Sequence, residues 1–311
     1  MKKYYERGKI MAKIYIQVGQ SIKSSRNEYY KVLGFLGRGA NAFTYRCICT
    51  SGCNKGIEFV IKIQYNLSNE IRRERFFKEA KFLQESSHPA ILTQYDYGTF
   101  ETRQESFPFI VTNYMPETLE KRMERNDIDF AFKVKYACQL LSAISFLQKK
   151  NIIHRDIKPN NIFISNNNAI LGDFGLIKEL NQDEQRIMDD DINLINETII
   201  NNEEGCAAMA RYYRTPELVN YANHKDELHI ESDVFQLGLV LAKLFTGENP
   251  LKECKNLHSP IEMNSVGYVD GPPKYGRIIH DTICKMLIVN YKERISIDLA
   301  VDKFTGIYAE L

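Results

Sequence analysis

Alternating apolar and polar residues in the first third of the chain predict β-strands. The pattern covers four segments: Tyr30–Leu36, Phe43–Cys49, Glu58–Gln64 and Ile110–Thr112. Between the third and fourth segments, Ile71–Gln84 has helical spacing instead, with Phe76, Ala80 and Leu83 along one face. This part of the chain is therefore expected to be β-rich with a single helix.

After Met115 the periodicity becomes mainly helical. Apolar residues recur at helical spacing in three long segments: Phe130–Gln148, Ile230–Thr246 and Tyr275–Leu287. The longest apolar stretch is Val234–Phe245, and Gln236 and Lys243 interrupt it. It is too short to cross a bilayer, so we expect a buried core helix there and no transmembrane segment.

Composition adds little to this picture. The chain has 311 residues, 44% hydrophobic and 26% charged, and a formal net charge of +1. These values are ordinary for a globular protein of about two lobes and give no reason to expect nucleic acid as a partner. Seven irregularly spaced cysteines and the lack of a recognisable signal peptide predict reduced thiols in the cytoplasm.

Cys47, Cys49 and Cys53 lie close together in the sequence and invite a zinc interpretation. A structural zinc site needs four ligands, and no fourth Cys or His is near. We therefore expect three small buried side chains.

The first 27 residues carry seven Lys or Arg against one acid, Glu6. One interpretation is a basic N-terminal extension that binds a partner or an anionic surface. The other is a solvated extension with a strand at Lys13–Val18.

The densest group of candidate chemical residues is His154-Arg155-Asp156-Ile157-Lys158-Pro159-Asn160-Asn161, followed twelve residues later by Asp173-Phe174-Gly175. One carboxylate can orient a hydroxyl and accept its proton, while a second carboxylate and an amide oxygen can hold Mg²⁺. The first segment resembles the catalytic loop of protein kinases, and the second resembles that family's metal-binding motif. The resemblance implies that Asp156 is the catalytic base and that Lys158 contacts the transferred phosphoryl group. It also implies that Asn161 and Asp173 hold Mg²⁺, with Mn²⁺ as the alternative.

Leu36–Thr44 resembles the Gly-rich loop of the same family, which covers the phosphates of ATP. The resemblance assigns nucleotide contacts to Gly37, Arg38, Gly39, Ala40, Ala42 and Thr44. Two positions depart from the usual pattern, because Ala42 replaces the third glycine and Thr44 stands where valine covers the adenine. Small residues at these places still let backbone N–H groups approach phosphates.

Further positions follow from the same resemblance. Lys62 matches the strand lysine that contacts the α- and β-phosphates, and Glu79 matches its paired glutamate on the family's αC helix. Thr112 is expected at the back of the adenine site, and the backbones of Asn113 and Met115 are expected to bind adenine. Thr118 is expected to meet the ribose.

Downstream, Thr215-Pro216-Glu217 stands in place of Ala-Pro-Glu, and Arg294 matches the arginine that pairs with that glutamate. Asp233 matches the residue that braces the catalytic-loop backbone. Ala210 occupies the position of a threonine that helps hold the catalytic Lys and Asp in Ser/Thr kinases. Losing that hydroxyl removes one hydrogen bond, worth about 1 kcal/mol.

The segment from Asp173 to Glu217 contains an acidic insert at residues 181–205, with eight acids against one base. Its apolar residues at helical spacing favour a short amphipathic helix, whereas its charge favours a disordered loop. Thr198 is the only hydroxyl residue between Leu176 and Ala210, and its neighbours are acidic. We expect activity not to require its phosphorylation.

Together the motifs cover about residues 29–306 and imply an α+β bilobal protein kinase fold. The expected division is a basic extension at 1–27, a small β-rich N-lobe with the αC helix at 28–113, and a larger α-helical C-lobe at 114–311. The implied activity is transfer of the ATP γ-phosphoryl group to Ser or Thr of protein substrates. The alternatives are a pseudokinase or ATP-binding scaffold, or a kinase of a non-protein substrate.

Overall fold

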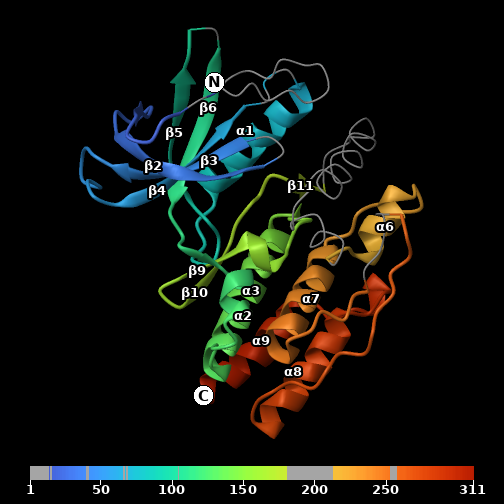
Figure 1. Ribbon diagram of the computed structural model, residues 1–311. Coiled ribbons are helices and arrows are strands. Elements are labelled where there is room, and N and C mark those ends of the chain that lie inside the picture. The colour runs from blue at the N-terminus through green and yellow to red at the C-terminus, as the bar shows by residue number, and fades with distance from the viewer. Residues whose placement is uncertain are drawn as a thin grey trace. The chain divides into compact units, whose positions relative to one another are not determined.

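The computed structural model describes residues 14, 16–39, 42–65, 67, 69–103, 105–180, 213–252 and 258–311. Contacts divide the chain into two compact units (Figure 1). The smaller unit comprises Met1–Glu85 and Thr93–Tyr114, and the larger unit comprises Ser86–Leu92 and Met115–Leu311. Ala40, the acidic insert with Thr198, and Ala210 lie outside the described residues.

The smaller unit is built on a six-stranded antiparallel sheet in the order β1-β2-β3-β4-β6-β5. Its strands are β1 (Ser21–Lys23), β2 (Tyr29–Arg38), β3 (Ala42–Cys49), β4 (Glu58–Gln64), β5 (Gln94–Glu101) and β6 (Ser106–Asn113), with one helix, α1 (Glu70–Glu85). All four predicted strands and the predicted helix are present. β1 and β5 were not predicted.

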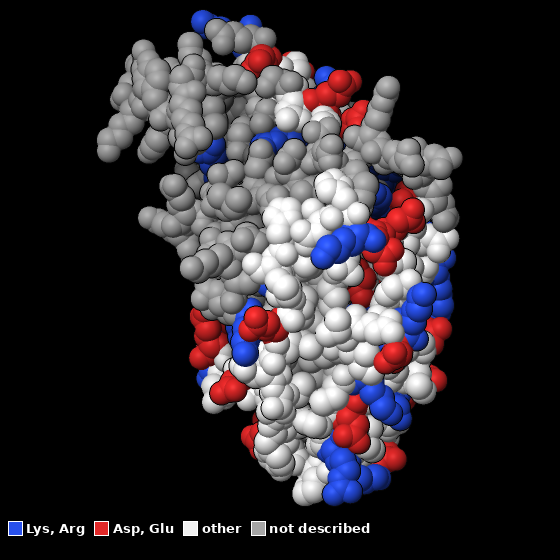
Figure 2. Space-filling model, turned by 90° about the vertical axis from the view of Figure 1, so that its right-hand side faces the viewer, with Lys and Arg blue, Asp and Glu red and all other residues white. Residues whose placement is uncertain are grey.

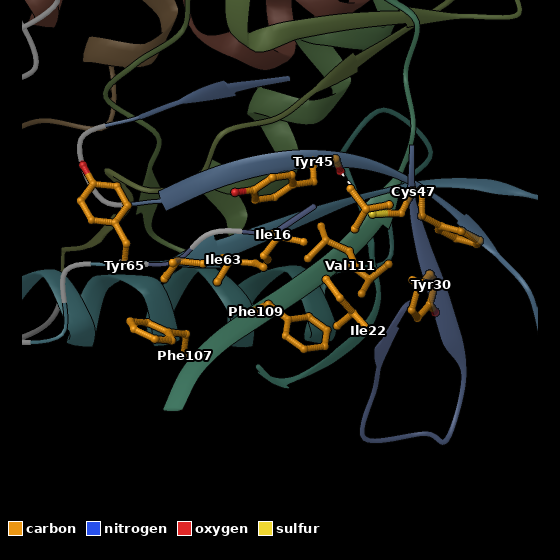
Figure 3. Packing of buried hydrophobic residues seen from close by; sticks show 14 of the residues in the cluster. Ile16, Ile22, Tyr30, Tyr45, Cys47, Ile63, Tyr65, Phe107, Phe109 and Val111 are labelled. Carbon is orange, nitrogen blue, oxygen red and sulfur yellow. Dashed lines mark hydrogen bonds between the residues drawn. The ribbon is translucent and has the colours of Figure 1, made fainter. Parts of the chain in front are cut away.

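The period-two pattern of β4 explains how this sheet makes a core and a functional face. Phe59, Ile61 and Ile63 are buried in one apolar cluster, and Lys62 lies between them on the opposite side of the strand. The same cluster takes in Phe107, Phe109 and Val111 from β6, as Figure 3 shows. β4 therefore holds the functional lysine on a strand whose other face is locked in the core.

The N-terminal prediction needs correction. Ile14 and Ile16 are buried in this cluster, and neither is in a strand. Ile16 is labelled in Figure 3. The strand forms later, at β1, where Ile22 is buried and pairs with Tyr30 of β2. The stretch expected to be a solvated extension is thus part of the sheet unit from Ile14 onward, because its isoleucines supply apolar surface to the core.

The cysteine prediction is confirmed for two of the three residues. Cys47 and Cys49 are buried on one face of β3, and burial raises the pKa of the Cys47 thiol to about 12. Cys53 is exposed in the turn after β3, contrary to the prediction. Among the described residues, no group of three or more His, Cys, Asp or Glu side chains could hold a metal ion.

The larger unit is mainly helical. Its helices are α2 (Leu119–Glu124), α3 (Phe130–Lys149), α6 (Pro216–Ala222), α7 (Ser232–Thr246), α8 (Pro273–Met286) and α9 (Ile297–Ala309). Short strands β7 (Glu117–Thr118), β8 (Ile152–Ile153), β9 (Ile162–Ser165), β10 (Asn168–Leu171) and β11 (Lys178–Glu179) join them, with 3₁₀ turns η1 (Pro159–Asn161) and η3 (Tyr291–Glu293). The three long helices expected after Met115 are present.

Helix α7 is the centre of the larger unit. Thirteen of its residues are buried, and it contacts α3 and α8 (Figure 1). A helix that is apolar on all sides is typical of such a buried position. It ends at Gly247, whose φ of 83° lets its N–H bond to the Lys243 carbonyl.

Helix α3 alone among the described helices is long and apolar enough to cross a membrane by length and composition. Its buried residues pack against α9, α7 and β10 inside the larger unit. Core helices commonly pass the same test, so this observation is weak evidence for a membrane span.

On the face that Figure 2 shows, Lys and Arg are interspersed with Asp and Glu over the described surface. This agrees with the near-zero net charge. That the chain does not bind nucleic acid remains a prediction.

Candidate active site

The loop between β8 and η1 is held in place by hydrogen bonds to α7. The carboxylate of Asp233, the second residue of α7, accepts hydrogen bonds from His154 N at 2.7 Å and Arg155 N at 3.0 Å. Asp233 is fully buried, and this burial raises the pKa of its carboxyl group. The predicted bracing role of Asp233 is confirmed.

Three polar side chains of this loop and of η1 contact one another: Asp156, Lys158 and Asn161. Lys158 Nζ lies 2.8 and 2.9 Å from the two carboxylate oxygens of Asp156. Asn161 Nδ2 donates to Asp156 Oδ2 at 2.7 Å and to the Asp156 carbonyl at 2.8 Å. The 3₁₀ turn η1 makes this possible, because it brings Asn161 back over Asp156 five residues later. The Asp156 carboxylate is therefore held in one orientation by a cation and an amide.

His154 connects this loop to the segment that carries Asp173. Its Nδ1 accepts the Asp156 N–H at 3.3 Å, so the proton is assigned to Nε2, which lies 3.1 Å from the Gly172 carbonyl oxygen. The imidazole is fully buried and packs edge-on against Phe174, with ring centroids 4.7 Å apart. His154 therefore packs behind the loop that carries Asp156.

Gly172 and Asp173 follow β10 directly. Gly172 N donates to the Asn161 carbonyl at 2.8 Å, and a Cβ at Gly172 would lie 2.5 Å from the Phe163 ring. Only glycine therefore permits this close approach. Asp173 and Arg155 have positive φ angles, 55° and 71°. Such conformations are costly for residues with a Cβ, and they cluster at functional sites.

The donor set at this place fits a hard cation. The Asn161 nitrogen is committed to Asp156, which leaves its amide oxygen as the atom that can face a metal. Asp173 is exposed and adds carboxylate oxygens. Mg²⁺ commonly uses one or two such protein ligands together with phosphate oxygens and water. The residues present therefore fit Mg²⁺.

In the smaller unit, the predicted ion pair is formed. Lys62 Nζ lies 2.7 and 2.9 Å from the two carboxylate oxygens of Glu79 on α1. The Glu79 side chain is 5% exposed and that of Lys62 is 26% exposed. Glu79 is thus enclosed, while the Lys62 side chain is partly exposed. Thr44 is the direct partner of Lys62 in the β3–β4 ladder.

The Gly-rich loop is the turn between β2 and β3. Gly37 pairs with Thr44, and Gly39 N bonds to the Ala42 carbonyl at 2.9 Å. A Cβ at Gly37 would meet no described atom within 4 Å, and at Gly39 it would only touch the Ala42 carbonyl oxygen. Packing of the described protein does not require glycine here, so these positions leave the backbone open to a ligand.

Tyr65 holds this turn from outside the motif. Its hydroxyl, at one end of the cluster in Figure 3, donates to the Gly39 carbonyl at 3.0 Å. The Arg38 guanidinium lies over the Tyr65 ring at 5.2 Å and donates to its hydroxyl at 3.4 Å.

The residues predicted to bind adenine and ribose are distributed over both units. Thr112 is buried near the end of β6, and Asn113 is its exposed last residue. Met115 and Thr118 belong to the larger unit. The Thr118 hydroxyl caps α2 by accepting the Lys121 N–H at 3.4 Å. The ribose contact of Thr118 stays a prediction.

Buried polar contacts hold helix α6 within the larger unit. Arg294 Nη2 donates to Glu217 Oε1 at 2.7 Å, with both side chains almost fully buried. Thr215, in place of the usual alanine, caps α6. Its hydroxyl oxygen lies 2.7 Å from that of Ser232, and the two groups are hydrogen-bonded. The predicted Glu217–Arg294 pair is confirmed.

Sequence reasoning missed two residues that shape the site, Tyr65 and Gln236. Gln236 could have been found, because it lies three residues after Asp233 in an otherwise apolar helix, and that spacing puts both side chains on one face. No pattern in the sequence marked Tyr65.

Comparison with known proteins agrees with this geometry. The profile of the protein kinase domain matches residues 30–304. A probable serine/threonine-protein kinase of Dictyostelium discoideum is 30% identical over 230 residues, which is 73% of this chain. The serine/threonine-protein kinase PknB of Mycolicibacterium smegmatis is 32% identical over 57% of this chain, and the serine/threonine-protein kinase WNK of Caenorhabditis elegans is 28% identical over 75%. The chain belongs to the protein kinase family, whose members generally use ATP and Mg²⁺.

The relatives are much longer than the region they share with this chain. The match covers 12% of the Dictyostelium and C. elegans proteins and 26% of the M. smegmatis protein.

Proposed function

We propose that this chain is an ATP-dependent protein kinase that phosphorylates serine or threonine hydroxyls of protein substrates. The observation that carries the proposal is the orientation of the Asp156 carboxylate by Lys158 and Asn161. Phosphoryl transfer requires mainly alignment and charge neutralisation, and this cluster supplies a fixed acceptor beside a cation.

In the larger unit, Asp156 orients the acceptor hydroxyl and takes its proton. Lys158, which already lies against Asp156, neutralises charge on the transferred phosphoryl group. Asn161 and Asp173 hold Mg²⁺, or Mn²⁺ as the alternative, which when bound neutralises the phosphate charge. Lys158 two residues after Asp156 supports the Ser/Thr class, as do the names of the relatives.

In the smaller unit, Lys62 binds the α- and β-phosphates and Glu79 keeps its ammonium group in place. Gly37, Arg38, Gly39, Ala40 and Ala42 cover the phosphates, and Thr44 covers the adenine. Thr112 and Asn113 bind the adenine together with Met115 of the larger unit, and Thr118, also of the larger unit, meets the ribose. The lobe division at residues 113 and 114 remains part of this proposal.

The test is transfer of labelled phosphate from γ-labelled ATP to a general protein acceptor, with identification of the phosphorylated amino acid. Asp156→Asn should lower kcat by about 10²-fold or more, because a positioned base contributes roughly 10²–10⁴-fold. Asp302→Asn removes an exposed carboxylate of α9 and is the matched control, expected to retain wild-type kcat.

Other outcomes identify the alternatives. ATP binding without turnover would indicate a pseudokinase, and phosphorylation of a small molecule but of no protein would indicate a non-protein substrate. Equal kcat for Asp156→Asn and the wild type would contradict the mechanism.

We also propose that the basic residues before Ile14 contact a partner. Replacing Lys2, Lys3, Arg7 and Lys9 by Gln should weaken binding to the protein substrate, and unchanged binding would refute the idea.

Cytoplasmic localisation is proposed from the thiols, since the described cysteines are free. Recovery of the chain in a membrane or secreted fraction would contradict it.

A further inference from the structure

Gln236 is a buried polar residue in the middle of α7, and only 3% of its surface is exposed. Its neighbours along the helix, Phe235 and Leu237, are fully buried apolar residues. A buried amide in such a place is costly unless its hydrogen-bonding groups are all used.

The amide of Gln236 is used at both ends. Its Oε1 accepts the N–H of Ile157 at 2.9 Å. Its Nε2 donates one hydrogen to the Arg155 carbonyl at 3.1 Å and the other to the Tyr213 carbonyl at 2.8 Å. A carboxamide has two N–H donors and an acceptor oxygen, so each hydrogen has a partner.

Two of these contacts lie on either side of Asp156. Asp233 binds the N–H groups of His154 and Arg155, and Gln236 binds the Arg155 carbonyl and the Ile157 N–H. The peptide groups before and after Asp156 are therefore fixed by a side chain that does not itself reach the carboxylate.

The third contact lies on a different segment. Tyr213 directly precedes Arg214, which is 1% exposed and donates to the Ser259 carbonyl at 2.7 Å, and Thr215, which caps α6. The Tyr213 carbonyl thus belongs to a stretch that is anchored by the two residues that follow it. One amide ties this stretch to the loop that carries Asp156.

We propose that Gln236 is a positioning residue that couples the backbone at Tyr213 to the orientation of Asp156. This inference rests on the proposed kinase activity. A shift of the Tyr213 segment would remove one of the two N–H bonds of Gln236 and loosen the loop that holds the base. The position of the segment ahead of α6 would therefore set the turnover rate without a contact to ATP.

The test compares Gln236→Met with Gln139→Met. Methionine keeps the length of the side chain but leaves the Ile157 N–H and two carbonyl groups without their partner. Gln139 is a matched control in the same unit, because its amide also bridges two groups, Asn168 Oδ1 and Ala169 N, both at 2.8 Å. Those groups belong to β10, which carries none of the proposed catalytic or binding residues.

For Gln236→Met we expect kcat for protein phosphorylation to fall about tenfold or more, since small misplacements of catalytic groups are costly. The KM for ATP should stay within about twofold, and the Ile157 amide should exchange hydrogen faster than in the wild type. Gln139→Met should leave kcat and the Ile157 exchange rate unchanged.

An unchanged kcat in Gln236→Met, an equal loss in Gln139→Met, or loss of the folded structure in Gln236→Met alone would overturn the positioning role. Inactivity of the wild type would instead refute the proposed function. The exchange rate at Ile157 would still report whether Gln236 holds the loop, so the two failures are distinguishable.

Discussion

At the scale of single residues, Tyr65 illustrates how a side chain outside the recognised motif fixes one inside it. It follows Lys62 by three residues, and its hydroxyl is bonded to the Gly39 carbonyl. Deleting that hydroxyl with Tyr65→Phe removes this neutral hydrogen bond, worth about 1 kcal/mol, together with the longer 3.4 Å contact from Arg38. We expect the KM for ATP to rise roughly fivefold, the factor that corresponds to this energy, with little change in kcat. Steady-state kinetics at varied ATP measures both.

Tyr95→Phe is the control for this prediction, because the Tyr95 hydroxyl accepts a hydrogen bond from Asn54 in the same unit. Its KM for ATP should match the wild type. If Tyr65→Phe bound ATP as well as the wild type, the turn would not depend on Tyr65.

The residue scale also shows what sequence reasoning could reach. Asp156, Lys158, Asn161 and Asp173 were identified because the chemistry requires these residue types at fixed spacing, and the structure brings the first three into direct contact. The hydrogen bond from Tyr65 to Gly39 was not predictable, since it joins residues 26 positions apart through a turn whose conformation no local pattern specifies.

At the scale of elements, strand alternation predicted β4 with its observed bounds, Glu58–Gln64, because one face is apolar throughout. It failed at the N-terminus, where Ile14 and Ile16 alternate like a strand but are buried without pairing. It also missed β5, Gln94–Glu101, whose buried positions include Asp96 and Gly98 rather than an apolar series. In both cases, packing within the folded unit determined which residues are buried and which pair in the sheet, and local periodicity did not.

The attachment of α6 gives a prediction about stability. Arg294 and Glu217 form a buried ion pair at 2.7 Å, with side chains 0% and 2% exposed. Removing one partner of such a pair leaves the other charge uncompensated, which typically costs about 3–5 kcal/mol. Arg294→Met should therefore lower the free energy of unfolding by about this amount, measured by urea denaturation.

The double variant Arg294→Met/Glu217→Gln should recover part of the loss, because no buried charge remains. Lys274→Met, which breaks an exposed pair with Glu310, is the control and should have no measurable effect. A small loss in Arg294→Met, equal to that of the control, would contradict this account.

At the scale of the whole molecule, each of the two structural units is made of segments that are not contiguous in the sequence. Ser86–Leu92 lies in the sequence between α1 and β5 of the smaller unit, yet it belongs to the larger unit. Its Ala90 carbonyl and Leu92 N–H both bond to Leu171, at 2.8 Å each, at the end of β10. No periodicity could reveal this, because the segment has no regular structure and its partner is about eighty residues away.

His88 fixes this segment to α3, and its environment predicts how stability depends on pH. Its Nδ1 accepts the Ala90 N–H at 3.2 Å, so Nε2 carries the proton and lies 3.1 Å from Ser142 Oγ. Burial lowers the pKa of His88 below its usual value of about 6.5. As pH falls through this value, the unfolded chain takes up a proton before the folded chain does, so the folded state loses stability. The Tm of the wild type should therefore fall between pH 7.5 and pH 5.5.

The variant His88→Gln cannot take up this proton, so its Tm should fall less over the same interval. Exposed His258 provides the control, and His258→Gln should show the full wild-type drop. The comparison uses the difference between the two pH values within each variant, which removes any constant effect of the substitution on Tm. An equal drop in His88→Gln and the wild type would show that protonation of His88 does not limit stability in acid, and that another group carries the pH dependence.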